Sequence, residues 1–272
     1  MTTKQTWDAV WQNSKGPKPS QLVEEIDREQ RSQRCQRILR FIETQGFNLA
    51  GLSVVEVGCG SAIYGCTLAR VGADVTVLDQ SEVALARARE RAEAVGVALK
   101  TVQGDALEFA KSHREKYDLA MSFGTVEHFR PPLREQMCQA HWDLVRPGGI
   151  VIISVPNVLF LPHEILKRLL ILRGKWFLGY EGSFTPWELK RVGRRLGLAH
   201  LAMHGTDLTD DVLKYCRIVA GTRLWARLFP WWRPKGRDDG ASRDALASPA
   251  RLKALVNRYL GHDITLMGVK DG

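Results

Sequence analysis

The twelve residues at positions 54–65, VVEVGCGSAIYG, decide the fold that we expect for this chain. A run of valines ends in a glycine-rich turn, and the acidic Glu56 interrupts the run where a buried parallel strand is normally apolar. Glycines at 58, 60 and 65 allow the backbone to approach a ligand closely at the start of a helix. The stretch therefore predicts a buried strand, a ligand-binding turn and a helix, in that order.

Outward from this turn, apolar runs alternate with helical segments along most of the chain. Strands are expected at 52–57, 74–78, 98–102, 117–122, 149–155, 198–204 and 264–269. Helices are expected at 62–71, 82–95, 132–145 and 186–196. Strands that alternate with helices in this way predict an α/β fold with a doubly wound parallel sheet.

The beginning of the chain has a helical pattern of its own. One helix is expected at 20–45, because Ser20 can cap its start, apolar residues recur at helical spacings and Gly46 can end it. We therefore expect an N-terminal helical cap at 1–45 and a main domain at 46–272.

Segments outside the alternation of strands and helices are expected to cover the ligand. Insertions at 157–185 and 206–261 follow strands whose carboxyl ends lie on the ligand side of a doubly wound sheet. Trp7 and Trp11 stand four residues apart, on one face of a helix. We expect these two rings to anchor the N-terminal cap over the pocket, where it can exclude water from the reacting groups.

Composition and cysteine usage restrict the class of protein. The chain is 44% hydrophobic and 25% charged, which is typical of globular domains. Its first residues have no apolar stretch behind a basic end, so no secretory signal is expected. The five cysteines are scattered, without a CxxC pair or clustered histidines, so we expect a cytoplasmic protein with no metal site.

Polar or backbone groups follow three further strands at their carboxyl ends. A carboxylate at Asp79 can accept two hydrogen bonds from the ribose hydroxyls of an adenosine. Asp105 and a neighbouring backbone N–H can read the amino edge of an adenine, and Phe123 and Gly124 follow the next strand. Taken singly, Asp79 can be a helix cap and Asp105 a turn residue. Together they predict a site for an adenosine-containing ligand at one edge of the sheet.

A dinucleotide is the obvious rival ligand, because its binding turn has the related spacing GxGxxG. Here the position of the third glycine is Ile63. The loop also contains Glu56 and has no nearby lysine or arginine, which disfavours a phosphate site. A nicotinamide-dependent oxidoreductase is therefore kept only as an alternative.

From about residue 50 to 155, and more loosely to its end, the chain resembles the class I S-adenosylmethionine-dependent methyltransferases. The matching stretches, in order, are VVEVGCGSA, VTVLDQSEVALARARE, VQGDALEF, YDLAMSFGTVEHF and LVRPGGIVIISVPN. The resemblance implies a Rossmann-like sheet of seven strands, mostly parallel with an antiparallel last strand. It also implies S-adenosylmethionine as the cofactor.

The resemblance further implies a role for each residue at the strand ends. Glu56 and the turn Gly58, Cys59 and Gly60 would hold the methionine part of the cofactor. Asp79 would bind the ribose with Gln80 beside it, Asp105 and Ala106 would bind the adenine, and the backbone at Ser122 or Phe123 would bind the methionine amino group.

The catalytic residue that we predict is His128. Methyl transfer from a sulfonium mainly requires alignment of the acceptor, so no metal is needed. If the acceptor is a hydroxyl, a base helps by removing its proton, and His128 follows the fourth strand beside the expected methyl position. Similar methyltransferases carry a comparable Glu-His pair. The alternative is that His128 caps a helix or closes the substrate pocket.

Motifs of other methyltransferase classes are missing from the sequence. The fourth strand is followed by SFGT, where methyltransferases that act on amino groups of nucleic-acid bases have an Asn/Asp-Pro-Pro-aromatic turn. Cys138 lies mid-helix, unsuited to cytosine carbon methylation, and Glu127 lacks the second glutamate of arginine methyltransferases. We therefore predict a small hydrophobic acceptor methylated at oxygen. An RNA methyltransferase and a non-catalytic S-adenosylmethionine-binding protein remain alternatives.

Two segments combine apolar stripes with cations and aromatic rings, namely 161–180 and 222–234. Most of the net charge of +9 lies nearby, since 160–236 contains 14 Lys or Arg against 6 Asp or Glu. Such segments suit a peripheral contact with a membrane and a lipid-like acceptor, as the resemblance to quinone-precursor methyltransferases also implies. They suit equally the inner face of a lid or a dimer contact, and less well a nucleic-acid surface.

Overall fold

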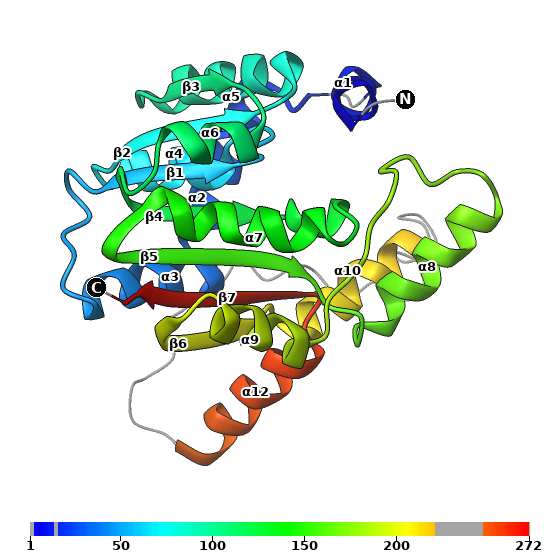
Figure 1. The fold of residues 1–272 in the computed structure, drawn as a ribbon. Helices are drawn as coiled ribbons and strands as arrows, with labels where there is room; N and C mark the ends of the chain where they lie inside the picture. Colours follow the sequence, from blue (N-terminus) through cyan, green and yellow to red (C-terminus); the bar gives the residue numbers. More distant parts are fainter. Residues whose placement is uncertain (1–2, 14–15, 221–246, 272) are drawn as a thin grey trace.

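The computed structural model describes residues 3–13, 16–220 and 247–271 and contains a seven-stranded sheet in the order β3-β2-β1-β4-β5-β7-β6. The strands are β1 (Ser53–Val57), β2 (Asp74–Asp79), β3 (Lys100–Gln103), β4 (Tyr117–Phe123), β5 (Val145–Pro156), β6 (Leu198–Gly205) and β7 (Asp263–Lys270). The first five strands are parallel, and β7 runs antiparallel to both of its neighbours, β5 and β6. The predicted fold class, including the antiparallel last strand, is confirmed (Figure 1).

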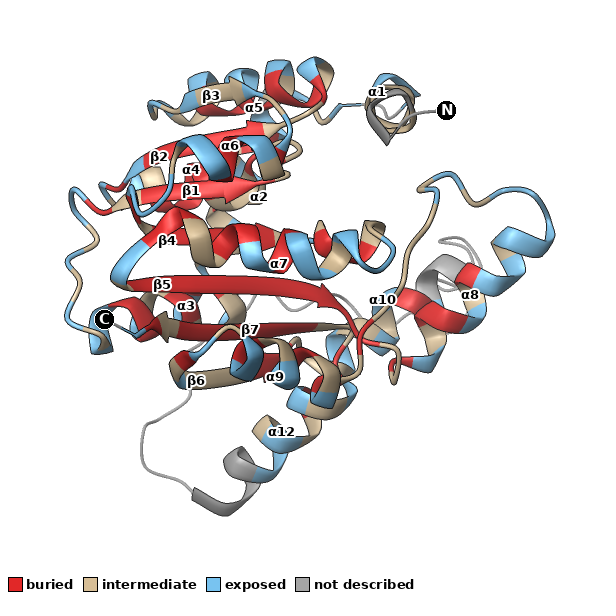
Figure 2. Ribbon diagram, viewed as in Figure 1, coloured by how far each residue is buried: buried red, intermediate tan, exposed pale blue. Residues whose placement is uncertain are grey.

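Helices cover both faces of this sheet (Figure 1). They are α1 (Thr3–Asn13), α2 (Pro19–Gln30), α3 (Gln33–Thr44), α4 (Ile63–Arg70), α5 (Glu82–Val95), α6 (Ala106–Ser112), α7 (Leu133–Leu144), α8 (Leu161–Leu172), α9 (Pro186–Arg195), α10 (Leu208–Ala220) and α12 (Ala247–Leu260), with a short 3₁₀ turn at Val126–His128. Apolar side chains of α3, α4 and α5 pack on one face, and those of α6, α7 and α9 pack on the other. The central strands β1, β4 and β5 are therefore buried on both sides (Figure 2).

The order of the strands opens a crevice between β1 and β4. The chain passes from β1 to β2 and β3 on one side, and then returns to β4 on the other side of β1. Pairing of β1 with β2 continues to Val57, whereas pairing with β4 ends one residue earlier, at Glu56 and Met121. In an open α/β sheet, ligands bind where neighbouring strands diverge in this way. The glycine turn begins at this point.

The single helix that we expected at 20–45 is wrong, because the chain forms two helices there. Ser32 has a non-helical conformation, with ψ of 146°, and its hydroxyl accepts a hydrogen bond from the backbone N–H of Cys35 at 3.0 Å. Ser20 does not cap the first helix, which begins at Pro19 after Lys18. The apolar pattern continues across the break because both helices bury a face, through Ile26 in one and Ile42 in the other.

The insertions contain structure that the sequence patterns did not predict. Within the insertion 206–261 the chain forms α10 and α12. A further helix that was not predicted, α6, lies outside the insertions and follows β3. The segment 222–234, which we expected to contact a membrane, lies outside the described residues. None of the described helices is long and apolar enough to cross a bilayer. The division of the chain at residue 45 stays a prediction, although Arg70 of α4 forms an ion pair with Asp27 of α2 at 2.5 Å.

Replacing the capping hydroxyl tests the break between α2 and α3. Ser32→Ala is expected to lower the free energy of unfolding by about 1 kcal/mol, because the N–H of Cys35 loses its acceptor. Urea denaturation measures this loss. Ser20→Ala, on the exposed side of α2, is the matched control and is expected to change the free energy of unfolding little. Equal losses in the two variants would contradict the assignment of the cap.

Candidate active site

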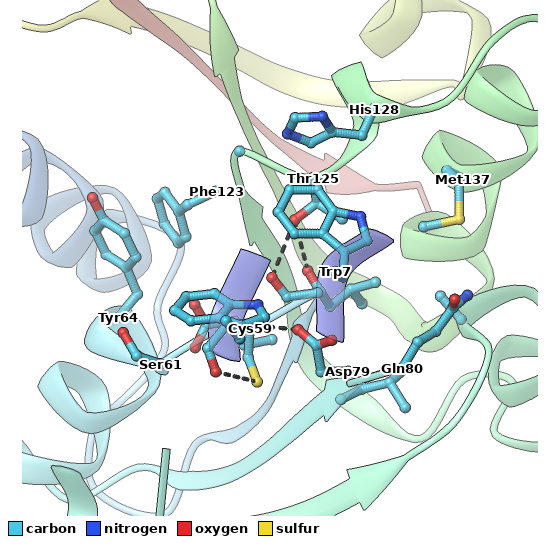
Figure 3. Close-up of a pocket in the computed structure, with 18 of the residues that line it drawn as sticks. Trp7, Cys59, Ser61, Tyr64, Asp79, Gln80, Phe123, Thr125, His128 and Met137 are labelled. Atoms are coloured by element: carbon cyan, nitrogen blue, oxygen red, sulfur yellow. Dashed lines mark hydrogen bonds between the residues drawn. The ribbon is translucent and has the colours of Figure 1, made fainter. Parts of the chain in front are cut away.

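A cavity of about 230 Å³ lies at the carboxyl ends of β1, β2 and β4. The glycine turn after β1 and the side chains of Trp7 and Trp11 on α1 line it. Figure 3 shows the ring of Trp7 above this turn. Tyr64 and Phe123 lie on one side of it and Met137 on the other (Figure 3). The structure thus brings most of the predicted cofactor residues into one cavity, at the crevice between β1 and β4.

The glycine turn is held in a shape that only glycine adopts easily. Gly58 and Gly60 have φ angles of +64° and +53°, in the left-handed region that other residues avoid. A Cβ atom on Gly58 would lie 2.4 Å from Thr125, and one on Gly60 would lie 2.6 Å from the ring of Trp11. Cys59, between them, is buried and lines the cavity. Backbone is therefore the surface that this turn offers to a ligand.

Glu56 is buried in β1 with its carboxylate directed at the helix that follows the turn. Its side chain is 2% exposed, and Oε2 accepts a hydrogen bond from the backbone N–H of Gly65 at 2.8 Å. Burial raises the pKa of the Glu56 carboxyl to about 8. Glu56 also lines the cavity, so the same group that ties β1 to α4 can face the positive charges of a sulfonium or an ammonium.

Asp79 lies at the end of β2 and faces the cavity. Its Oδ2 accepts from the N–H of Gly60 and its Oδ1 from the N–H of Ser81, both at 2.9 Å. Burial raises the pKa of the Asp79 carboxyl. Each carboxylate oxygen can accept more than one hydrogen bond, so Asp79 keeps acceptor capacity for ribose hydroxyls. Gln80 lines the cavity beside it.

Asp105 has a different position from the one its predicted role suggests. Its carboxylate caps α6, where Oδ1 accepts from the N–H groups of Leu107 and Glu108 at 2.9 and 3.2 Å. Its Oδ2 accepts from Gln80 at 2.9 Å, and Asp105 is exposed and absent from the cavity wall. Ala106, by contrast, lines the cavity. The adenine-binding role of both residues stays a prediction.

Of the two residues predicted at the end of β4, Ser122 and Phe123, only one lines the cavity. Ser122 is fully buried and does not line the cavity, whereas Phe123 does. The ring of Phe123 stacks on Tyr64, with 3.5 Å between ring centroids and 16° between planes. Tyr64 was not predicted as a site residue, although it follows the glycine turn and starts the helix that the cofactor would face. Binding of the amino group by backbone at 122 or 123 stays a prediction.

His128 occupies the wall of the cavity in a defined protonation form. Its Nδ1 lies 2.9 Å from the carbonyl oxygen of Tyr180, and since a carbonyl only accepts, Nδ1 carries the proton. Burial lowers the pKa of the imidazole, which keeps it neutral. The lone pair of a neutral His128 is then on Nε2. Trp7 packs its ring edge-on against this imidazole, with 4.7 Å between centroids.

Other cavity residues were missed because their sequence patterns are those of ordinary core or turn residues. Thr125, Phe129 and Met137 complete the wall. Thr125 donates to the backbone carbonyls of Val57 and Gly58 at 3.2 and 3.3 Å, and so joins the chain after β4 to the glycine turn. Only the position of Thr125, three residues before His128, could have drawn attention to it.

Comparison with known proteins agrees with this geometry. The family described as "Methyltransferase domain" matches residues 54–149. A ubiquinone biosynthesis O-methyltransferase of Aeromonas salmonicida is 32% identical over 174 residues, covering 61% of this chain and 71% of the relative. The chain belongs to the class I S-adenosylmethionine-dependent methyltransferases. The resemblance drawn from the sequence is thereby confirmed.

Other relatives of this methyltransferase match over shorter stretches or by fold alone. A ubiquinone biosynthesis O-methyltransferase of a Shewanella species is 36% identical over 119 residues, and the chain spans only 50% of its length. The magnesium protoporphyrin IX methyltransferase of Synechocystis PCC 6803, solved with bound S-adenosylhomocysteine, has a TM-score of 0.54 and 17% identity, over 98% of this chain and 93% of that one. At 17% identity, this similarity shows only that the two proteins share a fold.

S-Adenosylmethionine fits the residues of the cavity. The two left-handed glycines let Thr125 and Trp11 pack directly against the turn, and both glycines line the cavity with backbone. Asp79 has acceptor oxygens for the ribose hydroxyls, and a positive methionine end beside Glu56 would favour the ionised form of its carboxyl, which is protonated at neutral pH in the free protein. The stacked rings of Tyr64 and Phe123 add an apolar wall.

The raised pKa of Glu56 gives the site a testable pH dependence. Between the ordinary value of 4.5 and about 8, folded Glu56 holds a proton that the unfolded chain releases. The protonated carboxyl of Glu56 therefore makes its full contribution to the free energy of unfolding below pH 4.5, and this contribution is lost as the pH rises through about 8. Across that window the free energy of unfolding of the wild type is expected to fall relative to that of Glu56→Gln.

Urea denaturation at several pH values measures this difference, with a slope of up to about 1.4 kcal/mol per pH unit. Glutamine keeps an acceptor oxygen for the N–H of Gly65, so the tie to α4 survives in the variant. Glu43→Gln, at an exposed position on α3, is the control and should follow the wild type. Parallel curves for the wild type and Glu56→Gln would contradict a protonated Glu56.

Proposed function

We propose that this methyltransferase transfers the methyl group of S-adenosylmethionine to a hydroxyl oxygen of a small hydrophobic acceptor. The observation that carries the proposal is the lone pair on Nε2 of His128, which lies on the wall of the cofactor cavity, 3.8 Å from Oε1 of Glu127. A neutral imidazole in this position can accept the proton of a hydroxyl. An amine or thiolate acceptor would need such a base less.

The surroundings of His128 favour an apolar acceptor. Trp7 packs against this imidazole, and the same cavity is lined by the uncharged side chains of Phe129 and Met137, although Oε1 of Glu127 lies 3.8 Å from Nε2. The Aeromonas and Shewanella relatives are named for O-methylation in ubiquinone biosynthesis. This activity supports an acceptor that carries an aromatic hydroxyl on a hydrophobic molecule. Such an acceptor gains free energy from burial of its apolar surface in this wall.

The reaction moves one proton and one methyl group. The cofactor, when bound, supplies an electrophilic methyl group. His128 Nε2 would take the proton of the acceptor hydroxyl as the acceptor oxygen bonds to the methyl carbon, and the bond from that carbon to the sulfur of the donor would break to leave S-adenosylhomocysteine. Tyr180 holds the base through its carbonyl, which accepts from Nδ1–H and can strengthen that bond as the imidazole becomes positive. The proton leaves with His128 and is later released to water.

Helix α1 supports the proposal by closing the cavity. Ser81 donates to Asp8 at 2.6 Å, and Arg87 donates to the backbone carbonyl of Trp11 at 2.5 Å. These bonds fix α1 to the start of α5 and hold its two tryptophans over the site. Exclusion of water strengthens the electrostatic interactions among the reacting groups.

Label transfer from the cofactor tests both the acceptor class and the base. With methyl-labelled S-adenosylmethionine and a fractionated cell extract, label is expected in the organic phase, as an ether that resists mild acid and base. His128→Ala should lower kcat by about 100-fold or more, because the hydroxyl loses its base. Affinity for S-adenosylhomocysteine should change little, which calorimetry measures.

His113→Ala, at the end of α6 and away from the cavity, is the matched control and should keep full turnover. Label that stays with protein, or that is released by ribonuclease, would contradict a small hydrophobic acceptor. Full turnover of His128→Ala at every pH would contradict the role of the base. Cofactor binding without any transfer would indicate a non-catalytic binding protein.

We also propose that α8 docks on a membrane surface that supplies the acceptor. Its burial pattern is the reverse of that of most surface helices. Leu161, Ile165 and Leu172 are 63%, 56% and 83% exposed, whereas Glu164 and Lys167 are buried and bonded to each other at 2.7 Å. Hiding charges while exposing leucines costs free energy in water and is favourable against an apolar surface.

A vesicle assay tests the docking of α8. The double variant Ile165→Asp/Leu172→Asp is expected to bind anionic phospholipid vesicles at least about tenfold more weakly, because two apolar contacts are lost and two negative charges are added. Co-sedimentation measures this binding. Leu133→Asp, 46% exposed on α7, is the control and should bind like the wild type. A change in oligomeric state with unchanged vesicle binding would indicate a dimer contact instead.

A further inference from the structure

A second cavity, of about 520 Å³, lies at the β6 edge of the sheet, away from the cofactor turn. Its lining residues come from α3, α9 and α12 and from the strands β6 and β7. None of its lining residues falls within 54–149, the part of the chain that matches the methyltransferase family. Membership of the family therefore assigns no role to this cavity.

Four cationic side chains converge on this cavity, and none of the described residues that line it is acidic. They come from three different helices: Arg37 and Arg40 from α3, Lys190 from α9 and Arg258 from α12. Like charges brought together in this way repel one another unless an anion lies between them. A negatively charged partner would therefore relieve the repulsion among these cations.

Within the described part of the chain, these cations have few partners of their own. Arg40, Lys190 and Arg258 form no ion pair or hydrogen bond with any described residue. Arg37 makes only long contacts, to the carbonyl of Gly205 at 3.3 Å and to a glutamine at 3.4 Å. Burial, and the neighbouring charge of Arg258, lower the pKa of Arg37 although Asp207 acts against them. Asp207 is itself paired with Lys253 at 2.7 Å.

His204 on β6 adds an unpaired polar atom to the same cavity. Its side chain is 7% exposed, and its Nε2 is buried without a hydrogen-bond partner among the described residues. Burial and the charges of Arg37, Arg34 and Arg258 lower the pKa of His204 to about 3. A buried polar atom without a partner is costly, and the arginines around His204 make this end of the cavity favourable for an anion.

The remaining lining of the cavity is apolar. Phe41, Leu266 and Met267 are buried, whereas Leu201 and Met203 are only half-buried and leave apolar surface that a ligand can cover. An inorganic anion would pair with the charges and leave this apolar surface uncovered. A ligand with an anionic head and an apolar chain would satisfy both parts.

We infer that this second cavity is a binding site for an amphiphile with a phosphate head group. The phosphate pairs with Arg40 and Arg258 at the end of the cavity where His204 lies, while the apolar chain covers the half-buried Leu201 and Met203. A phosphate is the chemistry that several converging arginines recognise best. The site is separate from that for the methyl donor, so the two ligands bind together.

Calorimetric titration of the full chain tests the inference, with monomeric dihexanoyl phosphatidic acid as the probe. Saturable binding is expected, and it should persist when S-adenosylhomocysteine is present in excess. Dihexanoyl phosphatidylcholine, which has the same chains and a zwitterionic head, should bind at least about tenfold more weakly. Inorganic phosphate alone should also bind at least about tenfold more weakly, because it gains nothing from the apolar floor.

The double variant Arg40→Gln/Arg258→Gln should weaken binding of phosphatidic acid by about tenfold or more. Both side chains are exposed, so the fold should survive, and near-ultraviolet circular dichroism checks this. Arg191→Gln, at the exposed position next to Lys190 but outside the cavity, is the matched control and should bind like the wild type.

Several results would overturn the inference. They are an absence of binding, equal binding of phosphatidylcholine or of inorganic phosphate, competition by S-adenosylhomocysteine, and an equal loss in the Arg191→Gln control. The comparison of head groups uses the wild-type chain alone, so it decides the question even if the double variant fails to fold.

Discussion

The site depends on a buried carboxylate that bonds to the first turn of the helix after it. Glu56 stands in the middle of the sheet, where charge is costly, and its oxygen accepts the N–H of Gly65 at 2.8 Å. A Cβ atom on Gly65 would lie 2.8 Å from that oxygen, so only glycine permits this approach. The bond fixes the start of α4 relative to β1, and the glycine turn between them is thereby held open toward the crevice.

Much of the fold could be predicted from the sequence because it repeats one local pattern. The strands at the centre are short apolar runs between helices, and β1, β4 and β5 were placed within a few residues. The prediction failed where contacts between distant parts of the chain determine the local structure. The break at Ser32 was missed because Ile26 and Ile42 continue the same apolar rhythm on either side of it. The helices α10 and α12 interrupt the chain between two paired strands, and nothing local requires them there.

The cofactor residues were easier to find than the walls of the cavity. Glycines 58 and 60 and the carboxylate of Asp79 are unusual at strand ends, so the sequence alone exposes them. Asp105 shows the limit of this reasoning, since its carboxylate caps α6 and does not face the cavity. Tyr64 and Met137 have the residue types of an ordinary core. Their position beside the ligand follows from how α4 and α7 lie across the sheet, which no short pattern encodes.

The bond between His128 and Tyr180 joins two parts of the chain that are 52 residues apart. Tyr180 belongs to the insertion that also contains α8, and its carbonyl accepts from Nδ1–H, while Oε1 of Glu127 lies 3.8 Å from Nε2. If that insertion shifts, Nδ1–H loses its acceptor, and the tautomer with its lone pair on Nε2 loses the stabilisation that this bond gives. The position of the insertion and the protonation form of His128 are thus coupled. The tautomer that can act as a base has this stabilisation only while Tyr180 stays in place.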